Sequence, residues 1–225
     1  MKNKSIILLS GGLDSVVSLV MLKEDVKLAL LFDYGQKALN EEIKASKAIA
    51  KFYNIEHKII KLDWLKEIST SSLNTNEEIP ELTKELLNDK AITENTSKSV
   101  WVPNRNALFI NIAACFCEAN DYNSIIIGAN KEEGETFKDN SLAFINTINN
   151  SLKNSTNNNV QVLAPLIDKT KEEIVKIAIE KEIPFNLLYS CYSNQEKHCG
   201  KCESCLRLKR ALELNNRQDI ISTIF

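Results

Sequence analysis

Long hydrophobic runs and an excess of basic residues are both missing from this 225-residue sequence. The N-terminal apolar run extends only from Ile6 to Leu9, which is too short for a signal-peptide core, and no other stretch could span a bilayer. The 28 Lys plus Arg residues are balanced by 30 Asp plus Glu residues, so the sequence lacks the basic excess that binding of a phosphate backbone usually needs. We therefore expect a cytoplasmic protein that binds neither a membrane nor a nucleic acid.

Two common nucleotide-binding signatures are also missing. No Gly-Lys-Ser or Gly-Lys-Thr follows the N-terminal glycines, which excludes a Walker A loop there. Gly11 and Gly12 are adjacent and a third glycine is lacking, which excludes a dinucleotide-binding fingerprint. The sequence instead has SGGLDS, from Ser10 to Ser15, after a buried strand pattern and at the start of an apolar helical pattern. This order of strand, glycine turn and helix predicts an anion-binding loop.

The residue types in this loop suit the phosphates of ATP. Glycines let backbone amides approach an anion, and the N-terminus of the helix adds partial positive charge. The hydroxyl groups of Ser10 and Ser15 can donate further hydrogen bonds, while Asp14 can cap the helix or help to hold magnesium. Ligands of open α/β sheets bind at the carboxyl ends of the strands, where this loop falls. An ordinary glycine turn with a Ser or Asp cap is the alternative interpretation.

The rest of the chain alternates strand and helix patterns, which predicts a doubly wound, mostly parallel α/β sheet flanked by helices. Strands are predicted at Ser5 to Leu9, Leu28 to Asp33, His57 to Leu62, Ser124 to Gly128 and Val160 to Leu163. Helices are predicted at Asp14 to Lys23, Asn40 to Tyr53, Ala107 to Ala119, Leu142 to Leu152 and Lys171 to Glu182. We expect residues 1–186 to form this ATP-binding domain.

Polar segments interrupt the alternation and are predicted to be surface loops. Ile68 to Ser99 is rich in Ser, Thr, Asn and charged residues, and it is long enough to be a lid. Asn149 to Asn159 is low in complexity, which is typical of a solvated connection. Asn130 to Asn140, after the fourth strand, is a polar loop that could read a substrate. The sequence has no internal repeat.

Four of the six cysteines crowd the C-terminal region, at Cys191, Cys199, Cys202 and Cys205. A reducing cytosol disfavours disulfides, and the spacing C-x7-C-x2-C-x2-C supplies four thiolates for tetrahedral zinc without an open position. The spacing predicts one structural zinc per chain in a small helical module over residues 187–225, which includes a helix from Leu206 to Leu214.

The sequence leaves two further interpretations of this cysteine group open. An iron–sulfur cluster also uses closely spaced cysteines, although no Cys-Pro follows here. His198, next to Cys199, could substitute as a ligand. Cys115 and Cys117 are separate, and their apolar helical surroundings predict that both pack in the core.

Polar residues near other strand ends are candidates for the same edge of the sheet. Asp33, Tyr34 and Gln36 close the second predicted strand beside the phosphate loop. Arg105 and Asn106 stand before a long apolar helix in a chain where Arg is scarce. An arginine at that place suits the recognition of phosphate or carboxylate. A strand-ending turn and a solvated helix start would explain the same residues without a site.

A lysine and two glutamates complete the set of candidates. Lys171 stands in the first turn of a predicted helix, where a cation opposes the helix dipole, so contact with ATP phosphates competes with a structural explanation. Glu132 and Glu133 lie in the polar loop after the fourth strand. With Asp33, they are the candidates for a general base, and the sequence does not choose among the three.

Taken in order, these segments resemble the 7-cyano-7-deazaguanine synthase (QueC) family, on LSGGLDS, FDYGQK, VWVPNRN, IIIGANKEE, PLIDKTKEEI and the four-cysteine tail. SGGLDS alone resembles the PP-loop of N-type ATP pyrophosphatases, in which the loop takes the β and γ phosphates and chemistry occurs at the α phosphorus. The resemblance implies an adenine nucleotide alpha hydrolase-like fold. It also implies an ATP-dependent carbon–nitrogen ligase that converts 7-carboxy-7-deazaguanine and ammonia, through the amide, to the nitrile precursor of queuosine.

The resemblance further implies zinc at the four cysteines, and ATP, magnesium and zinc as cofactors. The implied nucleotide contacts are Leu8, Leu9, Ser10, Gly11, Gly12, Leu13, Asp14, Ser15, Val16, Val17, Ser18 and Leu19. The expected catalytic residues are Ser10, Asp14, Ser15, Arg105 and Lys171, and the expected substrate-binding residues are Asp33, Tyr34, Gln36, Arg105, Asn106 and Glu132. We expect a homodimer that takes ammonia free or from a partner, because no glutaminase domain is visible.

The chain departs from the family pattern at two places. Lys37 and Ala38 stand where the family commonly has Arg-His, and residues 135–140 replace a common Gly-Tyr-Pro-Asp-Cys stretch. The second departure leaves open a related enzyme that acts on another carboxylate. The sequence is also compatible with a PP-loop tRNA thiolation enzyme or with a nucleotide sensor that carries a zinc ribbon.

Overall fold

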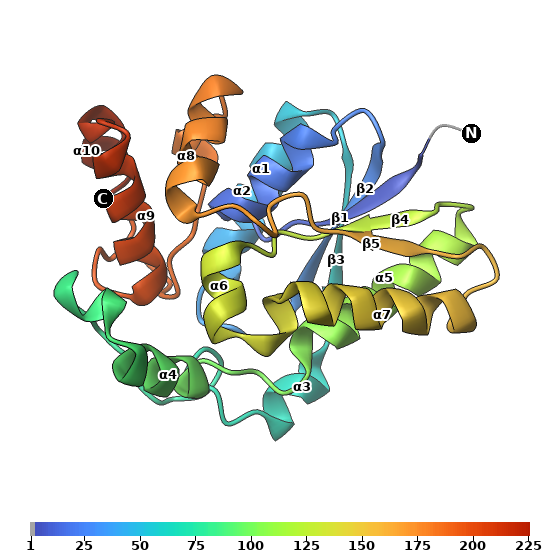
Figure 1. Cartoon of the computed structure of the whole chain (residues 1–225), viewed down its shortest axis with the longest axis horizontal. Helices are drawn as coiled ribbons and strands as arrows, with labels where there is room; N and C mark the ends of the chain where they lie inside the picture. Colours follow the sequence, from blue (N-terminus) through green and yellow to red (C-terminus); the bar gives the residue numbers. More distant parts are fainter. Residues whose placement is uncertain (1–2) are drawn as a thin grey trace.

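The computed structural model describes residues 3–225 and contains a five-stranded, all-parallel sheet (Figure 1). The strand order is β3-β2-β1-β4-β5. The strands are β1 (Ser5–Leu8), β2 (Val26–Asp33), β3 (Glu56–Lys61), β4 (Ser124–Ile126) and β5 (Gln161–Leu163). In the centre, Ile6 is in register with Leu28 on one side and Ile125 on the other. All five predicted strands are confirmed, with small differences at their ends.

Helices cover both faces of the sheet, as predicted for a doubly wound fold (Figure 1). One face carries α1 (Leu13–Met21), α2 (Leu39–Phe52) and α8 (Lys171–Glu180), and the other carries α5 (Arg105–Ala119) and α7 (Leu142–Ser155). Because successive strand residues point to opposite faces, Ile7 joins the hydrophobic cluster under α1 while Ile6 joins the cluster under α5. Within the described residues, no helix has the length and apolar character needed to cross a membrane.

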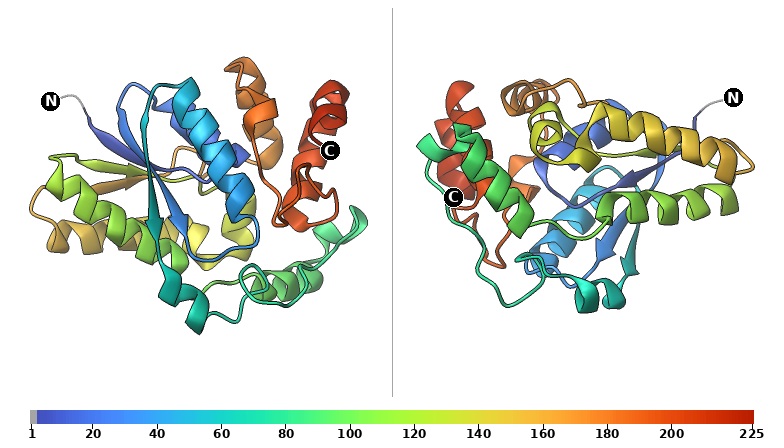
Figure 2. Two further views of the ribbon diagram at one scale, coloured as in Figure 1. Left: turned by 180° about the vertical axis from the view of Figure 1, so that it is seen from behind. Right: turned by 60° about the horizontal axis from the view of Figure 1, so that its bottom comes forward.

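The C-terminal helices pack beside α8 (Figure 2). They are α9 (Glu203–Leu214) and α10 (Gln218–Ile224). Leu208, Leu212 and Ile221 belong to the same hydrophobic cluster as the buried face of α1. The cysteine-rich region is therefore joined to the sheet domain by apolar packing. The proposed boundary between residues 186 and 187 stays a prediction.

The prediction of a surface loop from Ile68 to Ser99 is wrong for the second part of the segment, whereas residues 69–84 form no helix. This region holds the end of α3 (Asp63–Ile68), a short 3-10 helix (Glu85–Asn88) and α4 (Lys90–Ser99). The Asp89 side chain caps α4 by accepting hydrogen bonds from the amides of Ala91 and Ile92. Ser71 is buried, and its hydroxyl accepts a hydrogen bond from the Leu73 amide. Polar side chains in this region form hydrogen bonds with nearby backbone groups. A lid function for this region stays a prediction.

The other two predicted loops are also largely helical. Helix α7 continues through Ser155, so it includes most of the segment from Asn149 to Asn159. Asn149 helps to explain why the helix continues here. Its side-chain amide forms two hydrogen bonds with the backbone of Val162 on the edge strand β5, one as donor and one as acceptor. The segment from Asn130 to Asn140 forms α6 (Lys131–Thr136) and a 3-10 turn (Lys138–Asn140).

The prediction that both cysteines of α5 pack in the core holds for only one of them. Cys117 is buried, and burial raises the pKa of its thiol to about 12. Cys115 is exposed on the opposite side of the same helix. Two residues of separation turn a helix by more than half a circle, so the two side chains cannot share one face.

The strand order reverses between β1 and β4, which makes this the topological switch point of the sheet. Two glycines allow close approach of backbone segments there. A Cβ added at Gly11, whose φ is +86°, would lie 2.6 Å from Cβ of Ala45 on α2. A Cβ added at Gly128, after β4, would lie 2.9 Å from the Ser15 nitrogen on α1. Crevices at such switch points are the usual ligand sites of open α/β sheets. The glycines therefore allow the loop after β1 to lie at this crevice.

We predict that Gly11→Ala destabilises the protein far more than Gly200→Ala. Both glycines have positive φ, which costs an alanine about 1–2 kcal/mol. At Gly200 the added Cβ would meet only a Phe225 ring carbon at 3.7 Å, whereas at Gly11 it would also collide with Ala45. We expect this collision to lower the free energy of unfolding by about a further 1–3 kcal/mol in urea denaturation. Equal losses in the two variants would contradict the close packing of the loop.

Candidate active site and metal centre

The segment from Ser10 to Ser15 forms the turn between β1 and α1, as the sequence predicts. The Ser15 hydroxyl donates to the Gly12 carbonyl at 2.9 Å and lies 3.3 Å from the Ser10 hydroxyl. Gly12 occupies the N-cap position, and no side chain caps the helix. The alternative in which Asp14 caps this helix is therefore wrong. The first turn of α1 leaves backbone amides directed at the crevice, which suits an anion.

Two residues from the C-terminal region hold this loop. The Tyr189 amide donates to the Gly11 carbonyl at 3.0 Å, and the Leu13 amide donates to the Ser190 hydroxyl at 3.1 Å. Ser190 thus satisfies one of the amides that begin α1. Because Cys191 follows directly, the loop and the cysteine cluster are joined through three consecutive residues.

Asp14 and Lys171 form a buried ion pair beside the loop. Lys171 Nζ lies 2.6 Å from Asp14 Oδ2 and 3.3 Å from Glu133 Oε1. Burial raises the pKa of the Asp14 carboxyl to about 6, against the attraction of Lys171. Burial alone would lower the pKa of Lys171, but the charges of Asp14 and Glu133 outweigh it and raise that pKa. Asp14 Oδ1 is buried and has no hydrogen-bond partner among the described residues.

This pair explains why a lysine stands in the first turn of α8. Its side chain is turned away from the helix axis toward two carboxylates, so the unfavourable dipole is offset by direct ion pairing. Lys171 lies one ion pair away from the phosphate loop but does not line the cavity. Its predicted contact with ATP phosphates stays a prediction.

A cavity of about 280 Å³ opens in front of the loop. Its lining includes the predicted residues Leu8, Leu9, Ser10, Gly12, Leu13, Asp14, Ser15, Tyr34, Gln36, Arg105 and Asn106. Val16, Val17, Ser18 and Leu19 are instead buried within α1, and Gly11 faces α2. Asp33 does not line the cavity either, because its carboxylate turns to accept the Gly35 amide at 3.2 Å.

Arg105 and Tyr34 meet in the wall of the cavity. Arg105 Nη1 donates to the Tyr34 hydroxyl at 3.1 Å. Phe109, one turn along α5, stacks on Phe32 with ring centroids 4.0 Å apart and an angle of 8° between the rings. Burial alone would lower the pKa of Arg105, but its interactions with Tyr34 and Asp139 outweigh burial and raise that pKa. The guanidinium therefore stays charged in a largely apolar wall.

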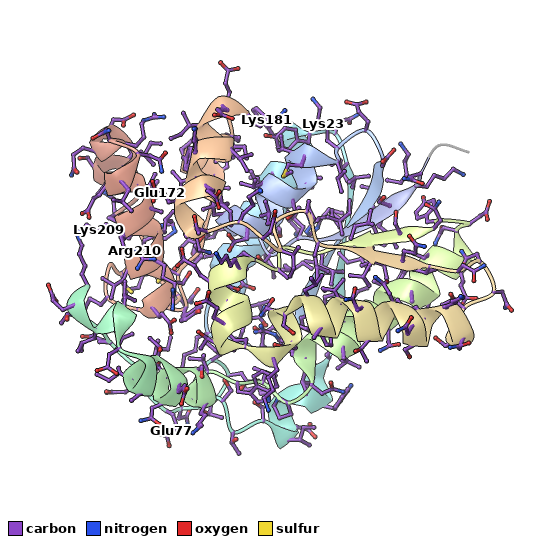
Figure 3. All side chains as sticks on the ribbon, in the orientation of Figure 1. Lys23, Glu77, Glu172, Lys181, Lys209 and Arg210 are labelled. Carbon is purple, nitrogen blue, oxygen red and sulfur yellow. The ribbon has the colours of Figure 1, made fainter. Side chains whose placement is uncertain are left out.

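Glu132 does not reach the cavity. Its Oε2 accepts hydrogen bonds from Arg207 at 2.9 Å and Arg210 at 2.7 Å, and its Oε1 accepts the Lys171 amide at 2.8 Å. Arg210, labelled in Figure 3, extends from α9 toward α6. Burial would raise the pKa of Glu132, but these partners outweigh it and lower that pKa. The structure therefore gives Glu132 a bridging role between α6, α8 and α9, whereas Glu133 faces the cavity.

The four C-terminal cysteines form a compact group that could hold a metal such as zinc. Their sulfur atoms all lie within 4.8 Å of one another, and Cys199 Sγ lies 3.8 Å from Cys205 Sγ. Tetrahedral zinc with bonds of about 2.3 Å requires sulfur separations of about 3.8 Å. Backbone amides also donate to these sulfurs, including those of Lys201 and Cys202 to Cys199 Sγ. Such donors stabilise thiolates, which are the form that binds metal.

His198 is not positioned as a ligand. Its Nδ1 can only donate to the Ile224 carbonyl, 3.2 Å away, and its Nε2 can only accept from the Ser190 amide, 3.0 Å away. These partners fix the neutral ring, and burial lowers its pKa. His198 therefore connects the chain end to Ser190, the residue that contacts the phosphate loop.

Sequence reasoning missed several residues that line the cavity, among them Glu42, Phe109, Ser190 and Tyr192. Phe109 belongs to an apolar helical pattern, which gives no sign of a ligand. Ser190 and Tyr192 flank Cys191, so their closeness to a predicted metal ligand was the available signal. Glu42 lies six residues after Gln36 on the first turn of α2 and is one of two glutamates there.

We predict that Lys171→Met lowers the free energy of unfolding by about 3 kcal/mol at pH 8, because it leaves Asp14 charged and buried without its partner. The loss should be smaller at pH 5. Asp14 already has a pKa near 6, above that of the unfolded chain, so its contribution favours folding at low pH and is lost as pH rises through that value.

Adding Asp14→Asn to Lys171→Met should restore most of the lost stability. Lys169→Met is the control, because Lys169 pairs with Asp168 at the surface, and no measurable change is expected. Chemical denaturation at both pH values measures each variant. A loss that is independent of pH, or a double variant less stable than Lys171→Met, would contradict the buried pair.

We predict that Cys202→Ser removes the metal and lowers the thermal unfolding midpoint, because structural metal binding contributes directly to folding. Cys115→Ser is the matched control, because Cys115 is exposed on α5. Elemental analysis after purification without oxygen should find one zinc per chain in the control and none in Cys202→Ser. Stoichiometric iron with labile sulfide would instead indicate an iron–sulfur cluster.

Comparisons with known proteins identify the family of the chain. Residues 4–216 match the family described as queuosine biosynthesis protein QueC. The 7-cyano-7-deazaguanine synthase of Methanobrevibacter smithii is 47% identical over 97% of each chain. That of Methanosarcina barkeri is 45% identical over 93% of this chain and 94% of its own. The solved NMN synthetase of Francisella tularensis covers 96% of this chain and 85% of its own, with 14% identity and a TM-score of 0.48. The chain belongs to the QueC family.

Proposed function

We propose that this protein is a 7-cyano-7-deazaguanine synthase, which uses ATP and ammonia to convert 7-carboxy-7-deazaguanine to the nitrile in the biosynthesis of queuosine. The observation that carries the proposal is the loop from Ser10 to Ser15, which opens into a cavity that is also lined by an arginine and aromatic rings. The family membership supplies the reaction, and the cavity offers groups for both a triphosphate and a planar carboxylate.

The first step is activation of the substrate carboxylate. The amides of the loop and the hydroxyls of Ser10 and Ser15 bind the β and γ phosphates, and Lys171 balances the added charge. A carboxylate oxygen attacks the α phosphorus and pyrophosphate leaves. Arg105 is suited to orient the carboxylate, since a guanidinium binds two oxygens at once. Ammonia then adds to the carbonyl carbon and displaces AMP, which gives the amide.

The second step repeats the activation on the amide oxygen. That oxygen attacks the α phosphorus of a second ATP and pyrophosphate leaves. Loss of AMP together with both protons of the nitrogen then gives the nitrile. The amide oxygen departs as part of AMP because AMP is a far better leaving group than hydroxide or oxide. Among the three carboxylates considered as general bases, Glu133 is best placed to accept protons, since Glu132 and Asp33 are occupied elsewhere.

Two metals fit this scheme. Asp14 Oδ1 is a buried carboxylate oxygen without a partner among the described residues, so it is available to magnesium, which would offset the charge of the triphosphate. Zinc at Cys191, Cys199, Cys202 and Cys205 would be structural, because four thiolates leave no open position. We further propose that ammonia is taken free or from a partner and that the protein is a homodimer.

Turnover in a defined mixture tests the proposal. Pure protein with ATP, magnesium, ammonium and 7-carboxy-7-deazaguanine should form AMP and the nitrile, detected by mass spectrometry. Asp14→Ala should lower kcat/KM by about 10² or more while the zinc content stays unchanged, because Asp14 lies in the phosphate site and not among the four cysteines. Asp168→Ala, an exposed carboxylate before α8, is the control. ATP binding without any nitrile would point to a QueC-like enzyme for another carboxylate.

A further inference from the structure

The cavity contains a glutamate that the phosphate chemistry does not use. Glu42 lies on the first turn of α2, lines the cavity and points one carboxylate oxygen, Oε2, at Gln36 Nε2, 2.7 Å away. Its other oxygen, Oε1, has no hydrogen-bond partner among the residues that the structure describes. Because Glu42 lines the cavity and is only partly buried, this oxygen is free to accept a hydrogen bond from a bound ligand.

Gln36 fixes the direction of this carboxylate. Its Oε1 accepts the Tyr34 amide at 3.0 Å, and its Nε2 donates both to the Phe32 carbonyl at 3.0 Å and to Glu42. Both amide hydrogens of Gln36 are therefore in use, and its side chain is buried. Since Gln36 cannot rotate without losing three bonds, Glu42 presents Oε1 as a fixed acceptor.

Aromatic and cationic groups surround the same part of the cavity. The two residues whose backbones Gln36 holds, Phe32 and Tyr34, carry rings that pack against Phe109 with centroids 4.0 Å and 5.7 Å away. Arg105 lies over the Tyr34 ring, 5.7 Å from its centroid. Flat, unsaturated rings bind to such surfaces by stacking. Burial also raises the pKa of Glu42, although its bond from Gln36 and the nearby Arg105 charge both act against this.

From this geometry we infer that Glu42 and Gln36, beside Phe109 and Arg105, form a recognition site for an amino-substituted purine-type base, whose exocyclic amino group donates to Glu42 Oε1. A carboxylate acceptor reads an amino group at a base edge and rejects a carbonyl oxygen at the same place. The site thus selects for base identity, separately from the loop that binds phosphate.

Two ligands of the proposed reaction share this chemistry. The adenine of ATP carries a 6-amino group, and 7-carboxy-7-deazaguanine carries a 2-amino group beside a ring N–H. The second of these rests on the proposed function, whereas the first requires only nucleotide binding. Ligands that lack the amino group separate the two.

Glu42→Gln is the informative substitution. The amide oxygen of the new side chain is held by Gln36 Nε2, so its NH2 group faces the ligand and replaces an acceptor with a donor. We expect the dissociation constant of the recognised ligand to rise about 10- to 100-fold, as for the loss of a hydrogen bond to a charged group. Glu41→Gln is the matched control, because Glu41 neighbours it on α2, pairs with Lys44 and does not line the cavity.

Isothermal titration calorimetry with two pairs of ligands measures their dissociation constants at this site and does not require turnover. ATP is compared with purine riboside triphosphate, and 7-carboxy-7-deazaguanine with its 2-desamino analogue. In the wild type, one amino ligand should bind about 10- to 100-fold more tightly than its partner. In Glu42→Gln the preference for the amino ligand should vanish in one of the two pairs. The pair that loses its preference shows whether Glu42 contacts adenine or the deazaguanine. A general structural defect would weaken both members of a pair equally.

Preserved preference for the amino ligand in both pairs after Glu42→Gln would overturn the inference, as would equal loss in Glu41→Gln. Failure of the proposed function gives a different result. In that case 7-carboxy-7-deazaguanine does not bind the wild-type protein, while the adenine pair still reports on Glu42. Unchanged metal content and thermal midpoint in both variants confirm that the fold is intact.

Discussion

The start of α1 is enclosed by backbone on three sides, and the rest of the site depends on this constraint. Gly11 lies against α2, Gly128 lies against Ser15, and the Leu13 amide is satisfied by Ser190 from the cysteine-rich region. Any side chain at either glycine would displace a neighbouring backbone. The loop is therefore preorganised by packing, so its amides need little rearrangement when they meet a phosphate.

The charges around the loop extend this constraint to the C-terminal helices. Asp14 pairs with Lys171 beneath the loop, and the neighbouring residues Glu132 and Glu133 on α6 divide between two partners. Glu133 joins Lys171, whereas Glu132 joins Arg207 and a second arginine on α9. Adjacent residues of α6 thus link the nucleotide site to the metal module, and removal of Lys171 would leave Asp14 without its cationic partner.

The sheet and the phosphate loop could be predicted from the sequence because buried parallel strands and glycine turns have strong local patterns. Helix α4 could not, because its Ser and Thr residues are typical of a loop while a cap at Asp89 and tertiary packing stabilise the helix. The cysteine group followed from spacing alone. Glu132 acts as a bridge because the fold brings Arg207 close to it, and Glu42 is oriented because the fold brings Gln36 close to it. Composition alone could not distinguish the bridging glutamate from the one in the cavity.

We propose that this enzyme activates a carbonyl oxygen of its substrate by attack on the α phosphorus of ATP, at the loop whose Leu13 amide bonds to Ser190. Oxygen transfer tests it most directly. When 7-carboxy-7-deazaguanine labelled with ¹⁸O in both carboxylate positions is converted to the nitrile, each of the two AMP molecules should carry one ¹⁸O. Unlabelled AMP, with the isotope found in phosphate, pyrophosphate or water, would contradict this mechanism.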